Sequence, residues 1–123
     1  MTVTGPDFLA LQVSDLERSA NFYETLLGLR RAPVSPPHAV VFATEPIAFA
    51  VREPMPGFDL DAVRPWAGAG VALWLHADDS QAVHDVLVEA GVRIVSAPAP
   101  GPFGLTFSFS DPDGYVVTIH DQV

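Results

Sequence analysis

The second half of the chain repeats the pattern of the first half. Residues 15–30 and residues 78–93 each begin with an acid, continue as an amphipathic stretch and end in glycine, an apolar residue and arginine. The offset is constant at 63 positions and joins Asp15 to Asp78, Gly28 to Gly91 and Arg30 to Arg93. In a chain of 123 residues this offset is about half the length, so it predicts two related half-domains. Paired half-domains build one cavity from two related walls, whose matching residues limit what the cavity can do.

Length and composition narrow the protein class. A chain of 123 residues can form one hydrophobic core but not two ordinary domains. Its residues are 49% hydrophobic and 17% charged, which indicates a globular protein. The net charge of −9 argues against nucleic acid and anionic membranes as partners, because both need a basic face. Acidity permits a cationic ligand, although solubility alone also explains it.

Several kinds of chemistry and targeting are not expected. The chain has no cysteine, which excludes disulfides, thiolate metal sites and a cysteine nucleophile. Residues 1–6 carry neither a basic nor an apolar segment of a signal peptide, and no apolar run approaches the ~20 residues of a membrane span. We therefore expect a cytoplasmic protein.

The first repeat predicts a strand, a helix and further strands. Residues 8–13 read as a strand, and Ser14 with Glu17 forms a capping-box pattern, although Asp15 is an alternative helix cap. The helix should end at Gly28, and its buried face should contain Leu16, Ala20, Tyr23 and Leu27. The strands that follow are expected over residues 29–34, 38–44 and 47–53.

The second repeat predicts the same order. We expect a strand over residues 71–76, a helix over 78–90 with Val83, Val86 and Ala90 on its buried face, and strands over 92–96, 105–110 and 115–120. Residues 97–102 read as a turn-rich loop, and Asp111-Pro-Asp-Gly114 as a hairpin turn. The fold class is therefore α+β, with β-α-β-β-β modules at about 6–53 and 71–121, a link at 54–70, and a single domain over 1–123.

Four motifs in this order resemble the vicinal oxygen chelate superfamily, over about residues 6–121. They are the strand and Val-Ser-Asp-Leu-Glu-Arg-Ser, the Asn-Phe-Tyr-Glu-x-Leu-Leu-Gly-Leu stretch, the second helix with its Ala-Gly-Val ending, and Asp111-Pro-Asp-Gly114. That superfamily contains glyoxalases, extradiol dioxygenases, fosfomycin-resistance enzymes and bleomycin-binding proteins. The resemblance implies a U-shaped mixed sheet around a cleft, with helices on the outer face, and a homodimer.

The positions of the family's metal ligands hold residues that are unsuited to a metal. Metal-using members carry a histidine seven residues before each helix-opening aspartate, and a glutamate four residues after the glycine of the last motif. The corresponding residues are Phe8, Val71 and Thr118. Phe and Val offer no lone pair, and a neutral hydroxyl is a poor ligand. Glu53 is the nearest candidate for a further ligand and would hold nothing alone. We therefore expect no metal and no cofactor.

The inferred cavity wall is mainly apolar. Alternation along the strands places on one face Phe8, Ala10, Gln12, Val71, Leu73, Leu75, Val116, Thr118 and His120. Gln12, Thr118 and His120 are its polar groups, which is the usual composition of a small-molecule pocket. Trp66 and Phe103 either stack on a flat ligand or pack ordinarily. Trp74 and Phe22 are expected in the core.

The four histidines have no metal-motif spacing. His120 is the one candidate for acid–base chemistry, or else an exposed residue at a strand end. His76 should share the face of Trp74 against the helices, and His84 should be solvated. His38 lies at the pocket rim or on the surface.

The sequence therefore favours a metal-free protein that binds a small organic molecule, in the manner of the bleomycin-resistance branch. Sequestration of an aromatic or cationic antibiotic-like compound is the expected role. One alternative is a metal-dependent or His120-assisted lyase, isomerase or dioxygenase of the glyoxalase type. Another is a subunit or regulatory module with a vestigial cavity.

Overall fold

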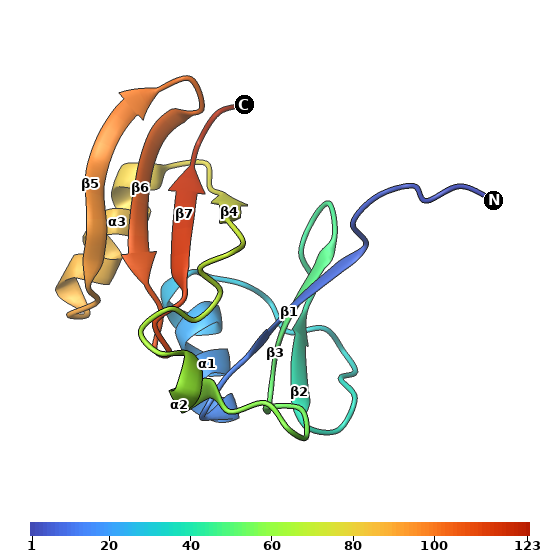
Figure 1. Ribbon diagram of the computed structural model, residues 1–123. Helices are drawn as coiled ribbons and strands as arrows, with labels where there is room; N and C mark the ends of the chain where they lie inside the picture. The colour runs from blue at the N-terminus through green and yellow to red at the C-terminus, as the bar shows by residue number, and fades with distance from the viewer. The chain divides into compact units, whose positions relative to one another are not determined.

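The computed structural model describes residues 1–123, which form two compact units, Met1–Leu60 and Asp61–Val123. The division falls inside the predicted link 54–70. Each unit contains one mixed β-sheet, of three strands in the first and four in the second, which confirms the α+β class (Figure 1). None of the helices has the length and hydropathy that a membrane span requires.

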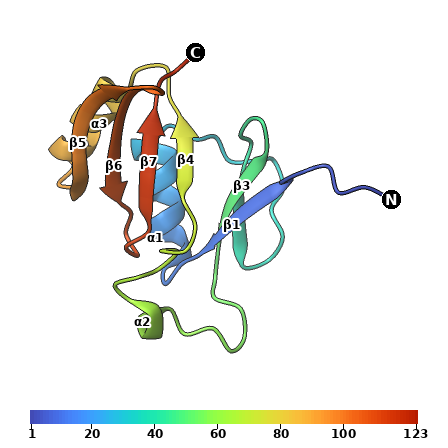
Figure 2. The same cartoon turned by 45° about the horizontal axis from the view of Figure 1, so that its top comes forward.

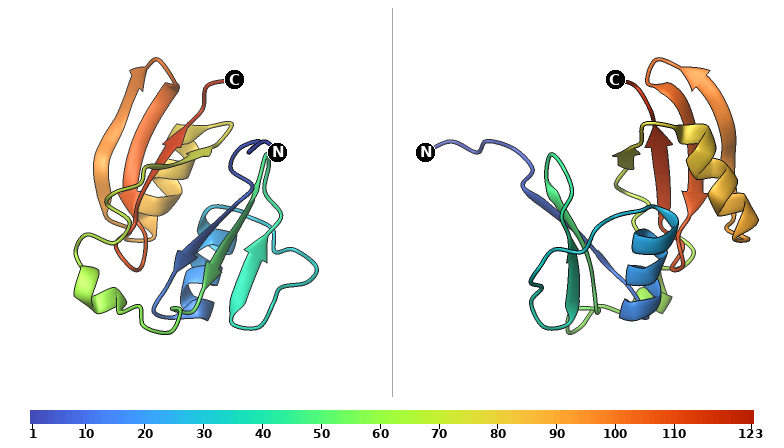
Figure 3. Two further views of the ribbon diagram at one scale, coloured as in Figure 1. Left: turned by 45° about the vertical axis from the view of Figure 1, so that its right-hand side comes forward. Right: turned by 180° about the vertical axis from the view of Figure 1, so that it is seen from behind.

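The first unit is a three-stranded sheet with one helix. Its elements are β1 (Phe8–Gln12), α1 (Leu16–Asn21), the π-helical turn η1 (Phe22–Leu26), β2 (Ala39–Phe42) and β3 (Ala48–Arg52). The strand order is β1-β3-β2, with β1 parallel and β2 antiparallel to β3. In Figure 3, α1 lies against this sheet, and it contacts β2 and β3.

Three aromatic rings form the centre of this unit. Tyr23 is fully buried, and its ring meets the ring of Phe49 edge-on with centroids 5.1 Å apart. Phe42 stacks on Phe49 at 6.0 Å. Such pairs each contribute about 0.5–1.5 kcal/mol beyond the area they bury. They fix the helix to the sheet at the expected helix residue Tyr23.

The second unit is a four-stranded sheet with α3 on one face (Figure 2). After the short α2 (Leu60–Val63), which crosses the division between the units, come β4 (Leu73–His76), α3 (Ser80–Glu89), β5 (Ile94–Gly101), β6 (Gly104–Ser110) and β7 (Val116–His120). The order is β4-β7-β6-β5, with only β4 and β7 parallel. As in the first unit, the first strand therefore pairs with the last.

The predicted turn at residues 111–114 is confirmed. The buried Asp111 carboxylate accepts hydrogen bonds from the backbone N–H groups of Asp113 at 2.9 Å and Tyr115 at 3.0 Å. This aspartate therefore holds the hairpin between β6 and β7 from inside, where water does not compete for its oxygens.

The predictions for residues 29–34 and 97–102 were wrong. Residues 29–34 form no strand, only an isolated bridge between Arg31 and Phe42, because Pro33 has no N–H to continue a ladder. Residues 97–102 are not a loop, since β5 continues to Gly101 as the edge strand of its sheet. Its register shifts beside Ser96, and an edge strand tolerates proline.

The repeat is offset by 64 positions at the helix starts. Asp15 caps α1 by accepting from the N–H of Arg18 at 3.1 Å, and Asp79, not Asp78, caps α3 by accepting from Ala82 at 3.0 Å. The terminal glycines Gly28 and Gly91, with φ of 73° and 80°, keep the offset of 63. The first helix thus has one extra residue, and a π-turn is how a helix accommodates an insertion. The turn η1 lies between the cap Asp15 and the terminal Gly28, and it accounts for the extra residue.

The buried face of α3 also differs from the prediction. Leu87 and Ser80 are fully buried, whereas Val86 is exposed. His84, expected in solvent, packs edge-on against Phe107 of β6 with ring centroids 5.4 Å apart. The helix begins at Ser80, two residues later than expected, and its inward face follows positions 80, 84 and 87.

The cap assignment predicts that two neighbouring aspartates differ in their contribution to stability. Asp79→Ala removes the acceptor for the Ala82 N–H and should lower the free energy of unfolding by about 1 kcal/mol. Asp78→Ala removes the same charge at the adjacent position and should change the free energy of unfolding by less than about 0.5 kcal/mol. Urea denaturation of both variants measures the difference, and an equal effect would contradict the offset of 64.

Candidate functional site

A hollow of about 870 Å³ lies in the second unit. The segment before β4, the starts of β5 and β7 and the β6–β7 turn line it, and among its residues are the predicted site residues Trp66, Val71, Leu73, Val116 and Thr118. Its volume lies within the range of small-molecule sites, which is about 300–1,000 Å³.

Large apolar side chains around this hollow are left in solvent. Trp66 is 72% exposed, Val71 68% and Val116 50%. A folded core would bury such groups, so their exposure in one concave region makes it a candidate binding surface. The sequence left stacking and ordinary packing open for Trp66, and its exposure rules out packing within its own unit.

A tight backbone approach positions Trp66. Gly68, with φ of 69°, lies so close to the Tyr115 ring that a Cβ there would stand 2.8 Å from the ring carbon Cδ1. The carbonyl of Trp66 accepts from the N–H of Ala69 at 3.0 Å, and its own N–H donates to Val63 at 2.7 Å. The indole is therefore presented by a defined turn.

An ion pair joins this turn to the hairpin. Arg64 donates to the fully buried side chain of Asp113 at 2.6 Å and to the exposed carboxylate of Asp61 at 2.9 Å. The residue was not singled out by sequence reasoning, because its partner lies 49 positions away. Nothing in the local pattern indicates such a contact.

The register of β4 changes which residues face the open side of the sheet. Trp74 pairs with Thr118 and His76 with His120, so these four share one face. Leu73 and Leu75 pair with Val117 and Ile119 on the opposite, core side, although Leu73 is also among the residues that line the hollow. The expected face assignments of Leu73, Leu75, Trp74 and His76 are therefore corrected, because the repeat offset is 64 here.

Four aromatic and imidazole rings contact one another on this open face, next to the part of β7 that lines the hollow. Trp74 meets Phe103 at 5.4 Å and His120 at 5.8 Å, and His76 meets His120 at 5.4 Å, all between ring centroids. Trp74 is 44% exposed, which is not the core position predicted for it. The Nδ1 atom of His120 is buried without a hydrogen-bond partner. His120 therefore has no carboxylate to orient it, as a catalytic base usually needs.

The remaining predicted site residues lie on β1 in the first unit. Phe8 is exposed, and it alternates with the buried Leu11 and Val13. Ala10 and Gln12 share its face, and the Gln12 side-chain oxygen accepts from the backbone N–H of Met55 at 2.7 Å.

Phe22, expected in the core, is half-buried with its ring edge-on to Tyr23. His38 is exposed and hydrogen-bonded to the Glu53 carboxylate.

The residues at the expected ligand positions do not fit a divalent metal. Seven positions before the observed caps Asp15 and Asp79 stand Phe8 and Ala72, so the offset of 64 replaces Val71 with another side chain without a lone pair. The Thr118 hydroxyl is hydrogen-bonded to Ser108 at 2.8 Å. No group of three or more His, Asp or Glu side chains is arranged to hold a metal ion.

Asp121 organises the end of the sheet next to His120. Its carboxylate accepts from the N–H of Leu105 at 2.7 Å and of Ser80 at 3.3 Å, which joins β6 to the start of α3. The Leu105 hydrogen bond, with help from Ser80, lowers the pKa of Asp121. Gly104 must remain glycine here, since a Cβ would stand 2.3 Å from the Asp121 oxygen.

Comparison with known proteins identifies the family of this chain. The family model of the Glyoxalase/Bleomycin resistance protein/Dioxygenase superfamily matches residues 5–119. The structure of TnmS3, an antibiotic binding protein from Streptomyces sp. CB03234, is similar over 98% of this chain and 97% of that one, with a TM-score of 0.74 and 26% identity. A glyoxalase/bleomycin resistance protein from the same organism covers 94% and 99%, with a TM-score of 0.73 and 26% identity. Virulence protein STM3117 of Salmonella typhimurium is 27% identical over all of this chain and 88% of its own length.

The lowered pKa of Asp121 predicts a loss of stability in acid. Its contribution is complete above the ordinary aspartate pKa of about 3.9 and is lost as the pH falls through the lowered folded-state value. Asp121→Asn should therefore be less stable than the wild type at pH 7, and the difference should shrink towards pH 2.5. Urea midpoints at both pH values measure this, with Asp7→Asn in the exposed N-terminal segment as the charge control. A difference independent of pH would contradict it.

Proposed function

Because the chain belongs to the Glyoxalase/Bleomycin resistance protein/Dioxygenase superfamily, we propose that it binds a small organic molecule of the antibiotic-like aromatic kind. The protein sequesters this molecule without changing it chemically. The observation that carries the proposal is the exposed Trp66 at a hollow of about 870 Å³. The antibiotic-binding relative TnmS3, which resembles this chain over nearly its whole length, supports it.

The energetics of such a site are favourable for a flat, apolar guest. Trp66, Val71 and Val116 together offer apolar surface that a ligand can remove from water, at about 25 cal/mol per Å². Stacking on the indole adds about 0.5–1.5 kcal/mol. The turn that presents Trp66 is already formed, so little ordering free energy is lost on binding.

The alternative function is that of a lyase, isomerase or dioxygenase of the same superfamily. The feature that favours it is His120. Its buried, unpartnered Nδ1 is a titratable group on the open face of the sheet. Because His120 is outside the lining of the hollow and has no carboxylate partner, binding without chemistry is the better-supported function. A homodimer, which the resemblance implies, remains a prediction and is tested by light scattering.

Tryptophan fluorescence tests the binding proposal directly. In Trp74→Phe, Trp66 is the only tryptophan, so saturable quenching during titration with a panel of aromatic antibiotics would report contact with its indole. We expect at least one compound to bind with micromolar affinity or better.

Calorimetry with matched variants locates the bound compound. Trp66→Ala should weaken binding about 5- to 10-fold, and Val116→Ala about 3-fold, since each removes apolar contact. Val88→Ala is the control, because Val88 is also 50% exposed but lies on α3 away from the hollow. Unchanged affinity in all three variants would place the ligand elsewhere, and no binding by a broad library would contradict the proposed function.

A further inference from the structure

The hollow contains a cation without a partner. Arg93 is one of its lining residues, and its side chain makes no hydrogen bond or ion pair in the structure. The other cation in the lining, Arg64, is neutralised by Asp61 and Asp113. Arg93 is therefore the one charged side chain of the lining that has no oppositely charged partner, in a protein with a net charge of −9.

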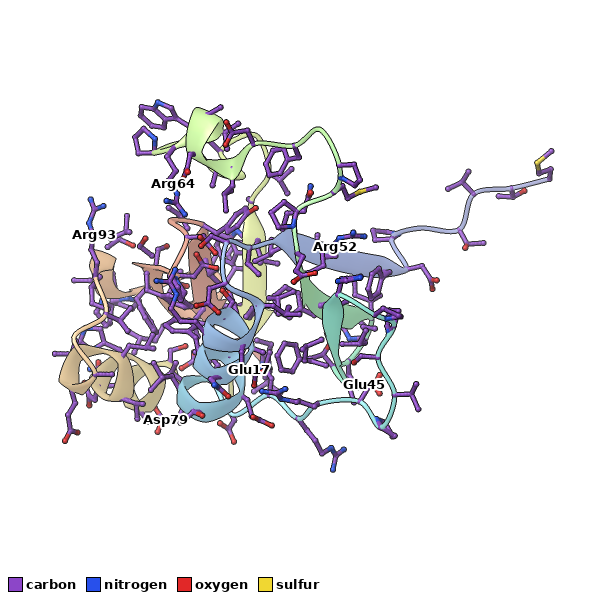
Figure 4. All side chains as sticks on the ribbon, turned by 90° about the horizontal axis from the view of Figure 1, so that it is seen from below. Glu17, Glu45, Arg52, Arg64, Asp79 and Arg93 are labelled. Carbon is purple, nitrogen blue, oxygen red and sulfur yellow. The ribbon has the colours of Figure 1, made fainter.

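The backbone of Arg93 is fixed by its surroundings. Gly91, with φ of 80°, ends α3 just before it, and the Arg93 carbonyl accepts from the N–H of Ser110 at 3.0 Å. Two positions further along, Val95 also lines the hollow, as expected for side chains on one face of a strand. Figure 4 shows the Arg93 side chain projecting from the ribbon on the side of the unit where Arg64 lies.

The repeat supplies an internal comparison. Arg30 is the counterpart of Arg93 and follows Gly28 as Arg93 follows Gly91. The Arg30 carbonyl accepts from the N–H of Ala43 at 2.8 Å, so both arginines have the same backbone role. Arg93 belongs to the lining of the hollow in the second unit, whereas Arg30 lies in the first unit. Arg30 is therefore a counterpart with the same backbone role but away from the hollow.

We propose that the hollow selects aromatic acids: ligands with a flat apolar body and an anionic carboxylate, sulfonate or phosphate group. The anionic group pairs with Arg93, and the aromatic body lies against Trp66, Val95 and Val116. The planar guanidinium has donors that match two oxygens of such a group, and an adjacent apolar surface strengthens the pair by excluding water. This inference rests on the proposed function and reverses the cationic ligand that the net charge alone permits.

Two fluorescent probes of nearly the same shape test the charge preference. One is 8-anilinonaphthalene-1-sulfonate, and the other is N-phenyl-1-naphthylamine, which has the same rings without the sulfonate. The wild type should bind the sulfonate about tenfold more tightly than the neutral probe. Arg93→Gln should abolish this preference by weakening the sulfonate about tenfold, while the affinity for the neutral probe changes less than about twofold. Arg93→Lys should keep part of the preference, because it keeps the charge but not the two-oxygen geometry.

Arg30→Gln is the matched control, since it makes the same charge change at the equivalent position of the other repeat. It should leave the affinities for both probes unchanged. If both arginine variants weaken the sulfonate equally, only the overall charge matters and the inference is wrong. If both probes bind equally and Arg93→Gln has no effect, the inference fails while the binding function stands. If neither probe binds to the hollow, as judged by the absence of an effect of Trp66→Ala, both proposals are contradicted.

Discussion

The parallel pairing of first and last strands decides which side chains each unit buries. In the first unit β1 pairs with β3, and in the second β4 pairs with β7. The second pairing aligns Trp74 with Thr118 and Leu73 with Val117. Because a shift of one residue would exchange the two faces of a strand, this register determines both the core under α3 and the open face with its rings. The buried Asp111 then fixes β7 against β6 on the other side.

Most elements could be predicted because their signals are local. The glycines that end both helices, the Asp15 cap and the Asp111–Gly114 turn each depend on residues close in sequence. The face of β4 was predicted from an offset of 63 and was wrong, because the offset before the π-turn is 64. The π-turn at Phe22–Leu26 has no signature that distinguishes its residues from an ordinary helix. The sequence alone aligned Asp15 with Asp78, 63 positions away, whereas the observed caps Asp15 and Asp79 are 64 positions apart.

The site was predictable where it follows strand alternation and unpredictable where it depends on the link. Val116 and Thr118 were found from the period of two, and the structure gathers them with Trp66 and Val71 in one hollow. Phe103 and His120 instead join Trp74 in a separate ring cluster. Arg64 and Arg93 were missed as lining residues, because the first acts through a distant aspartate and the second was seen only as part of the repeat.

The prolines of β5 have a consequence for how the second sheet ends. Pro98 and Pro100 both lie on the edge strand β5, and neither has an N–H group to donate to a further strand. A strand of a neighbouring molecule that paired with β5 would lack two backbone N–H donors there. The prolines therefore disfavour the addition of another strand at this edge. Although β5 is a long edge strand, they protect it from edge-to-edge aggregation.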